Sequence, residues 1–401
     1  MAVQTTSNLS SSIRTLYSDR YIRGAQMQRL YDQLAVPVGQ VGVEKAARLG
    51  NTVQVNFLSA LTPGTSAISE TADVTPQTFR EATATLSPTS RGEAIQFSEE
   101  LTMDVFTDFT AKAFEAVGEL QMETVEVLAI AAALAGGNVL RAAARASLDA
   151  GTSGNRMSDT VMSEIETILL SLKCPGFVAE GRSTWFAIMP PAAFHDLRTG
   201  GNVVSVALYQ QGSIILAHEL GQVGAFRLIS SPWAKVFGGA GADNASNAAT
   251  TLSSAANKLA TQIVVASESN ITVGDWLTIG TEETGNTFYP TNERVRVSAD
   301  YVSGTTIDII GQGENGGLRY DHASGAAVRN ADSVYPVIYG GPMSMAKLFD
   351  APTGEFGKAV GPKTDGLLDQ WQSLGFKFYG DYGRWVESWL LRGEYSTSLE
   401  A

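Results

Sequence analysis

The sequence predicts an α+β fold in which a long helix lies between a strand-rich segment and a sheet domain. Three observations support this: polar and apolar residues alternate from Thr52, a helical apolar stripe runs from Ser98 to Gly136, and short strands with glycine and asparagine turns begin near Gly238. The first pattern has the period of a half-buried strand and the second that of an amphipathic helix. With 401 residues, the chain has room for about two or three domains.

The composition is that of a folded protein with few charges. Only 17% of residues are charged and 40 are glycine, which fits a surface covered by copies of the same chain and equally fits an ordinary glycine- and alanine-rich domain. The net charge of −13 argues against a protein that reads DNA by gripping its phosphates. The same negative charge is compatible with a container protein whose inner surface must not adhere to the DNA inside it. Residues 1–50 differ, since six basic and three acidic side chains make them a mildly basic arm.

Targeting and redox signals are few. Cys174 is the only cysteine, so no internal disulfide can form and a reducing compartment is expected. The N-terminus lacks the basic and apolar regions of a signal peptide. The apolar stretch Val127–Gly137 is about half the ~20 residues that a membrane span needs, so we expect a packed helix there.

Residues 52–97 predict a protruding β-hairpin followed by a third strand. The third strand lies around Ile95 and Phe97, and a polar tip from Ser66 to Pro76 separates the first two. Because an isolated hairpin is marginally stable in water, it should rest on a neighbour. The apolar positions of the first two strands are Val53, Val55, Phe57, Phe79, Ala82, Ala84 and Leu86.

The clearest helix begins at Ser98, which can cap it, and ends at Gly136-Gly137. If unbroken it would run to roughly 38 residues, with Gly118 as a possible bend. Its apolar stripe is expected at Leu101, Val105, Phe109, Ala113, Val117 and Leu120.

A sheet domain follows. A helix over about Asp159–Leu172 precedes the strand Thr184–Met189, which is apolar enough to be buried on both faces, and Pro190-Pro191 opens a helix through Leu197. A similar strand returns at Val334–Tyr339, and the aromatic block Trp371–Tyr395 closes the chain as strand.

Between these parts the sequence changes character. The glycine-rich run Gly238–Ser246 predicts a flexible linker, and the short strands after it predict a small barrel or sandwich. Residues 243–332 hold 11 acidic and 5 basic side chains, a net charge of −6. We therefore expect an inserted, outward-facing module.

This order of arm, hairpin, long helix, sheet domain, insertion and closing strand resembles the major capsid proteins of tailed phages, which have the Hong Kong 97-like fold. The likeness is to the podophage type and covers most of the chain outside Gly238–Ser333. The segments that carry it are Arg20-Tyr21-Ile22-Arg23-Gly24-Ala25, Trp185–Arg198 with its ending Pro-Ala-Ala-Phe-His-Asp-Leu-Arg, and Trp371–Lys377.

The resemblance implies five regions. They are an N-terminal arm (1–51), an extended loop hairpin (52–97), a peripheral domain with the spine helix (98–155 and 371–401), an axial domain (156–238 and 334–370) and an inserted β domain (239–333). It implies a subunit that forms hexamers and pentamers of an icosahedral head around double-stranded DNA. The expected partners are other copies, a separate scaffolding protein, a portal and a decoration protein. Assembly is expected in the host cytoplasm, the final location is the virion, and no membrane is involved.

Two alternatives stay open. An encapsulin-like compartment would keep the fold and enclose an enzyme cargo instead of DNA. A β-rich tail component or adhesin would use residues 238–333 to bind a glycan.

No residues point to catalysis, so we expect no enzyme, no catalytic or metal-binding residues and no cofactor. Gly311-Gln312-Gly313-Glu314-Asn315-Gly316 has the letters of a dinucleotide loop but is followed by no helix-forming stretch, so a β-turn is expected. His195, His218 and His322 lack the spacing of a zinc site and are expected at the surface or as caps. Cys174 is expected to be a packed residue. The pairs Glu99-Glu100 and Glu282-Glu283 are expected to serve a helix terminus and to be solvated, respectively.

Two absences lead to predictions. No lysine lies between Lys45 and Lys112, so the hairpin cannot supply the lysine that welds some shells of this fold, and we expect a non-covalent shell. The first strand begins near Thr52, which leaves too few residues for a scaffold domain ahead of the arm, so a separate scaffold or none is expected.

Overall fold

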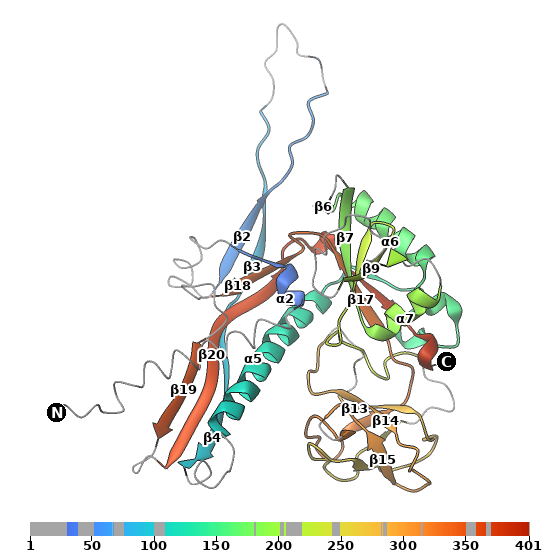
Figure 1. Cartoon of the computed structure of the whole chain (residues 1–401). Coiled ribbons are helices and arrows are strands. Elements are labelled where there is room, and N and C mark those ends of the chain that lie inside the picture. The colour runs from blue at the N-terminus through green and yellow to red at the C-terminus, as the bar shows by residue number, and fades with distance from the viewer. Residues whose placement is uncertain are drawn as a thin grey trace, which may run out of the picture. The chain divides into compact units, whose positions relative to one another are not determined.

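The computed structural model describes residues 30–38, 52–65, 67, 76–99, 109–179, 182–200, 204–205, 219–242, 249–281, 283, 287–313, 316–349, 358–365 and 370–400. The chain divides into two compact units. The first comprises Met1–Ala129 and Met345–Val386, and the second comprises Ile130–Ser344 and Glu387–Ala401 (Figure 1). Each unit is described by itself below.

The first unit is built on a five-stranded sheet with the long strand β20 (Trp371–Arg384) at its centre. Along one side, β20 pairs antiparallel with β4 (Thr89–Ser98); along the other, it pairs with β19 (Lys358–Asp365) and β18 (Met345–Phe349). The short strand β1 (Ala35–Pro37) adds to β18 in parallel. Strand alternation explains the core side of β20, because Leu374, Phe376 and Phe378 are buried while Lys377 between them is exposed.

The predicted hairpin is confirmed as a separate two-stranded sheet. Strands β2 (Val53–Leu58) and β3 (Glu81–Leu86) pair antiparallel from Val53 opposite Leu86 to Leu58 opposite Glu81. In Figure 1 the chain continues beyond both strands as two extended legs. The third predicted strand is β4, which lies in the sheet with β20.

The long helix is α5 (Phe109–Leu134), which ends just before Gly136-Gly137 as predicted. Residues 100–108, where the first turns were expected, lie outside the described residues. The buried stripe contains Ala113 and Val117, but the prediction for Leu120 is wrong, since that side chain is 40% exposed. The polar residues Gln121 and Glu126 are buried instead. A helical face predicted from hydrophobic residues alone omits polar side chains that are buried because they have partners in the fold.

The second unit contains an eight-stranded mixed sheet in the order β5-β21-β17-β7-β10-β9-β8, with β6 paired to β7. As predicted, β7 is buried on both faces, since Trp185 to Met189 are at most 2% exposed. The strand bounds are Val139–Leu140 for β5, Leu390–Tyr395 for β21, Tyr335–Gly340 for β17, Arg182–Met189 for β7, Phe226–Ser230 for β10, Glu219–Val223 for β9, Val204–Ser205 for β8 and Phe177–Ala179 for β6.

Two helices cover one face of this sheet. Both α6 (Asp159–Ser171) and α7 (Pro191–Thr199) lie close to the predicted ranges. Their buried side chains share one apolar cluster with alternate residues of the strands. The cluster includes Met162, Ile165, Leu169, Ala193, Leu197, Trp185, Ala187, Phe226, Leu228, Val337 and Tyr339.

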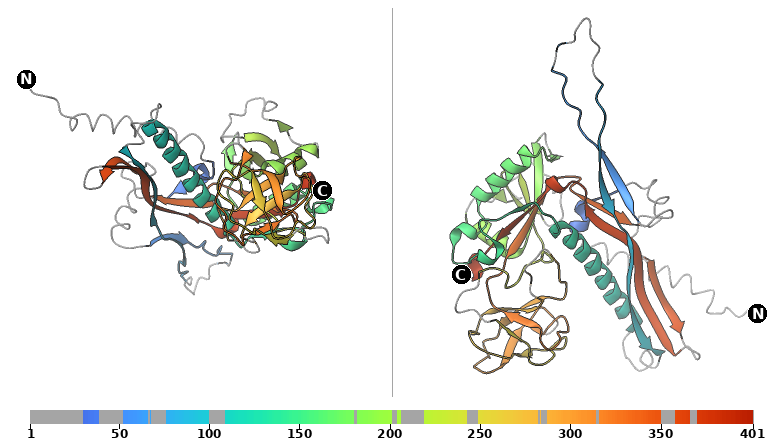
Figure 2. Two further views of the ribbon diagram at one scale, coloured as in Figure 1. Left: turned by 90° about the horizontal axis from the view of Figure 1, so that it is seen from below. Right: turned by 180° about the vertical axis from the view of Figure 1, so that it is seen from behind.

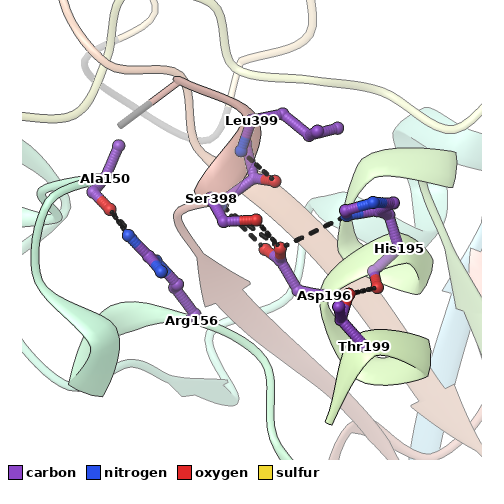
Figure 3. A network of polar contacts seen from close by, with 8 residues as sticks. Ala150, Arg156, His195, Asp196, Thr199, Ser398 and Leu399 are labelled. Atoms are coloured by element: carbon purple, nitrogen blue, oxygen red, sulfur yellow. Dashed lines mark hydrogen bonds and ion pairs between the residues drawn. The ribbon is translucent and has the colours of Figure 1, made fainter.

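The C-terminal turn η6 (Ser398–Glu400) is tied to α7 by Asp196 (Figure 3). The Asp196 carboxylate accepts the backbone N–H of Ser398 at 3.1 Å and also its hydroxyl hydrogen bond. Its neighbour His195 lies beside the same carboxylate at 3.7 Å. These contacts fix residues 398–400 against the sheet domain.

Residues 249–329 form a six-stranded antiparallel sheet in the order β11-β16-β13-β14-β15-β12. It has its own apolar cluster, whose members in the described part of the chain all lie between Leu252 and Val328. The strands are β11 (Ala249–Thr251), β12 (Gln262–Val264), β13 (Trp276–Gly280), β14 (Glu293–Val297), β15 (Thr306–Ile310) and β16 (Ala327–Arg329). The predicted all-β character of this stretch is confirmed.

The prediction of a flexible linker is wrong for the first half of the run Gly238–Ser246. Residues 237–242 are hydrogen-bonded, since Gly241 donates to the carbonyl oxygen of Asp332 at 2.7 Å and Ala242 to that of Leu148 at 2.9 Å. A Cβ on Gly241 would lie 2.7 Å from both of these carbonyl oxygens, so glycine is needed here for close approach. Glycine in this run allows packing and not only flexibility.

The structure groups the closing strands differently from the predicted regions. The block Trp371–Tyr395 is two strands, because β20 lies in the sheet of the first unit while β21 pairs with β17 in the second. Strands β18 and β19, expected with the axial region, pair with β20. Period-two patterns predict strands but not their partners, and pairing here joins residues nearly 300 positions apart.

No helix within the described ranges is both long and apolar enough to cross a membrane.

Candidate assembly surface

The two described histidines lie in different surroundings. His195 on α7 has a 52% exposed side chain, as expected for a surface residue. His322 contradicts the expectation, since its side chain is 4% exposed and its Nε2 lies 2.8 Å from a carboxylate oxygen of Glu293. His218 lies outside the described residues. Among the described residues, no three His, Cys, Asp or Glu side chains come together to hold a metal ion.

Cys174 is a packed residue, as predicted. It is 6% exposed, and its thiol lies 3.7 Å from the backbone carbonyl oxygen of Trp389. Burial raises the pKa of the thiol to about 11. A thiol that stays protonated near neutral pH is a poor nucleophile.

The described glycines at the two ends of the run 311–316 are joined by backbone hydrogen bonds. Gly311 donates to the carbonyl oxygen of Gly316 at 2.6 Å, and Gly313 donates to that of Gly317 at 2.8 Å. No α-helix follows within residues 316–349. The N-terminal helix turn that would hold a pyrophosphate is therefore missing from this stretch.

The glutamate pairs have different outcomes. The backbone N–H of Glu99 donates to the carbonyl oxygen of Gln370. Glu100 and Glu282 lie outside the described residues. The expectation that the second pair is solvated is wrong for Glu283, which is 2% exposed and lies 2.6 Å from the Lys235 ammonium. Burial raises the pKa of Glu283, while Lys235 acts in the opposite direction.

The hairpin of β2 and β3 presents apolar side chains to solvent. Leu58, Leu61 and Phe79 are 67%, 48% and 64% exposed. The two legs stay joined beyond the strands, because the Gln77 side chain donates to and accepts from the backbone of Thr62 at 2.8 Å in both directions. Single exposed apolar residues are ordinary, but three on one extended hairpin mark a surface that a neighbour can cover.

A second part of this surface is an open groove of about 380 Å³ on the sheet of the first unit. It runs across β4, β20 and β19. Small and charged residues both line it. The lining residues include Gly92, Ala94, Gly375, Val360, Arg91, Glu93 and Lys377.

One buried polar contact was not predicted. The Glu126 carboxylate on α5 accepts backbone N–H groups of Leu30 and Tyr31, at 3.1 and 2.9 Å. In the sequence Glu126 stands between Val125 and Val127 in a helical stretch, where a glutamate reads as solvated. No local signal distinguishes it, because its partners lie about 95 positions earlier.

No protein family matches the sequence. No curated protein matches it either.

Solved phage capsids share the fold of this chain. The capsid of Ralstonia phage GP4 matches with a TM-score of 0.56 at 10% sequence identity, over 91% of this chain and 87% of that one. The capsid of cyanophage Pam1 matches with a TM-score of 0.50 at 11% identity, over 91% of this chain and 89% of that one. At this identity the likeness establishes the fold, which is mixed α+β and Hong Kong 97-like, as the order of segments predicted.

Proposed function

We propose that this chain is the major capsid protein of a tailed phage and that it assembles into hexamers and pentamers of an icosahedral head around double-stranded DNA. The observation that carries the proposal is the β2–β3 hairpin, which exposes Leu58, Leu61 and Phe79. A two-stranded hairpin is marginally stable alone and gains buried area when another copy covers it. The role is structural, and no described site supports catalysis.

Two solved structures with this fold support the proposal. The two solved structures named above are capsids, and they match this chain over most of its length. Fold likeness alone does not give function, so the proposal also depends on the exposed hairpin.

We assign residues 239–333 to an inserted domain that faces outward. Its separate sheet and apolar cluster support this assignment, and its charge of −6 suits a surface away from DNA. The arm (1–51), hairpin loop (52–97), peripheral and axial regions follow from the same proposal. Because β18 and β19 pair with β20, while β21 pairs with β17, we place the boundaries between the peripheral and axial regions differently from the ranges predicted from the sequence.

The proposed partners are other copies of the chain, a separate scaffolding protein, a portal and a decoration protein. Packaged DNA would lie nearby without specific contacts. The shell would form in the host cytoplasm and remain in the virion. Since no lysine lies between Lys45 and Lys112, the hairpin would hold its neighbours non-covalently.

Electron microscopy of the purified, expressed protein tests the proposal, with particles from a phage lysate as control. We expect the expressed protein to form closed icosahedral shells. We expect the lysate particles to be such shells with nucleic acid inside. Shells that contain a packed enzyme instead would favour an encapsulin-like compartment. Monomers or trimers under the same conditions would favour a tail component or adhesin and would overturn the proposal.

A further inference from the structure

The carboxylate of Glu126 is buried beneath the segment Leu30–Val38. Glu126 is 1% exposed, and its two oxygens accept the backbone N–H groups of Leu30 at 3.1 and 3.2 Å, Tyr31 at 2.9 Å and Asp32 at 3.5 Å. The same segment contributes four buried apolar residues to the first unit: Leu30, Tyr31, Leu34 and Ala35. A carboxylate on α5 is therefore covered by the segment that it binds.

Other contacts hold the segment beside Glu126. Asp32 accepts a hydrogen bond from the Tyr382 hydroxyl at 2.6 Å and from the Lys347 ammonium at 3.0 Å. Strand β1 adds to β18 in parallel from Ala35 to Pro37. Among the described residues, the ionisable groups that these contacts place near Glu126 are Tyr31 and Asp32 of the segment. Lys347 and Tyr382 are engaged by Asp32.

Burial makes the charged form of Glu126 costly. It raises the pKa of the carboxyl to about 7, although the amide hydrogen bonds from Tyr31 and Leu30 act in the opposite direction, and the nearby charge of Asp32 adds to the rise. Lifting the segment would return the carboxylate to water, where a glutamate pKa is about 4.3.

We propose that Glu126 makes the docking of Leu30–Val38 on α5 depend on pH, so that acidification fastens this segment and alkaline conditions loosen it. The segment lies within residues 1–51, the stretch assigned above to the N-terminal arm. This inference concerns the subunit itself and does not depend on shell formation.

The sign follows from proton linkage. The docked state binds the Glu126 proton more tightly than the undocked state does. The docking equilibrium constant therefore rises as pH falls through about 7, and it stops rising near the pKa of Glu126 in the undocked state. Between pH 8 and pH 5.5 the docking equilibrium should shift by roughly 30-fold toward the docked state.

Hydrogen–deuterium exchange of the full-length protein tests this. The readout is the protection factor of the Leu30–Asp32 amides at several pH values from 5.5 to 8, corrected for intrinsic exchange. The amides of Val337 and Ile338 in the buried strand β17 serve as an internal reference. We expect protection at Leu30–Asp32 to rise about 30-fold toward pH 5.5 relative to the reference.

Two variants complete the design. Glu126→Gln keeps the shape and cannot titrate, so its protection should not change with pH. Glu119→Gln on the same helix changes an exposed glutamate and should behave like the wild type. A flat wild-type profile, or an unchanged slope in Glu126→Gln, would overturn the proposal. The wild-type profile decides alone if Glu126→Gln does not fold.

Discussion

Glu394 on β21 shows how the second unit buries charge. It is fully buried and is approached by Arg145 at 2.5 Å, by Arg392 at 3.0 Å and by Arg141 at 3.4 Å. Arg392 also donates to the backbone carbonyl oxygen of Leu134 at the end of α5. Buried charges of this kind need several partners to offset their loss of water. The cluster fixes β21 against the end of α5.

The ion pair of Lys235 and Glu283 should be costly to break from one side. Glu283→Ala leaves the Lys235 ammonium, whose side chain is 9% exposed, without its partner. We expect a loss of about 3 kcal/mol in the free energy of unfolding. Denaturant unfolding of unassembled protein, followed by tryptophan fluorescence, measures it.

Two further variants serve as controls for this pair. Glu268→Ala removes an exposed carboxylate and should cost less than about 0.5 kcal/mol. Replacing both partners with Lys235→Met and Glu283→Leu should recover most of the loss, since apolar groups can substitute for a buried pair. An equal cost for Glu283→Ala and Glu268→Ala would contradict this account.

At the residue scale, the sequence predicts the burial of a side chain where that burial depends on neighbours in the chain. The packed Cys174 and the exposed His195 were predicted from their neighbours in the chain. Burial of Glu283, His322 and Glu126 was not, because each depends on a partner outside its own element: Lys235, Glu293 and the Leu30–Asp32 amides. A polar residue with a distant partner looks like a solvated residue in the sequence.

At the scale of elements, periodicity predicted which segments are strands or helices and left their partners open. The buried run Trp185–Met189 and the alternation around Val53 each gave the right element. The placement of β20 between β4, β18 and β19 depends on tertiary packing, as does the separation of β21 from it. The helical turns predicted over residues 100–108, after a start at Ser98, stay a prediction.

The sheet of residues 249–329 should be separable from the rest of the second unit. Among the described residues, its apolar cluster draws on none outside Leu252–Val328. Polar contacts, such as the hydrogen bond from Arg294 to the Tyr335 hydroxyl at 2.7 Å, join it to the sheet domain. Replacing residues 249–329 with a short Gly-Ser link should leave a cooperatively folding protein. The replacement keeps the hydrogen bond between Gly241 and Asp332.

Circular dichroism and thermal unfolding measure this outcome. Loop closure costs little entropy, so a shortened chain with native-like secondary structure and one cooperative transition is expected. Insoluble aggregate, or a soluble product without a transition, would show that this sheet and the rest of the second unit fold as one.

At the scale of the whole molecule, the missing lysines lead to a simple prediction. Mature particles boiled in detergent should release one band near 42.5 kDa, because the hairpin offers no lysine for a covalent bond to a neighbour. Gel electrophoresis with and without boiling measures it. A ladder of covalent multimers would show that another residue pair welds the shell.

The central claim is that copies of this chain build a shell through the β2–β3 hairpin, and sedimentation velocity tests it most directly. Wild-type protein is compared with a variant in which residues 59–80 are replaced by a two-residue turn, which removes Leu61 and Phe79 and keeps β2 and β3. The account predicts large, closed particles for the wild type and only small species for a variant that still folds. Equal sedimentation of the two proteins as large particles, or the absence of large particles from both, would contradict it.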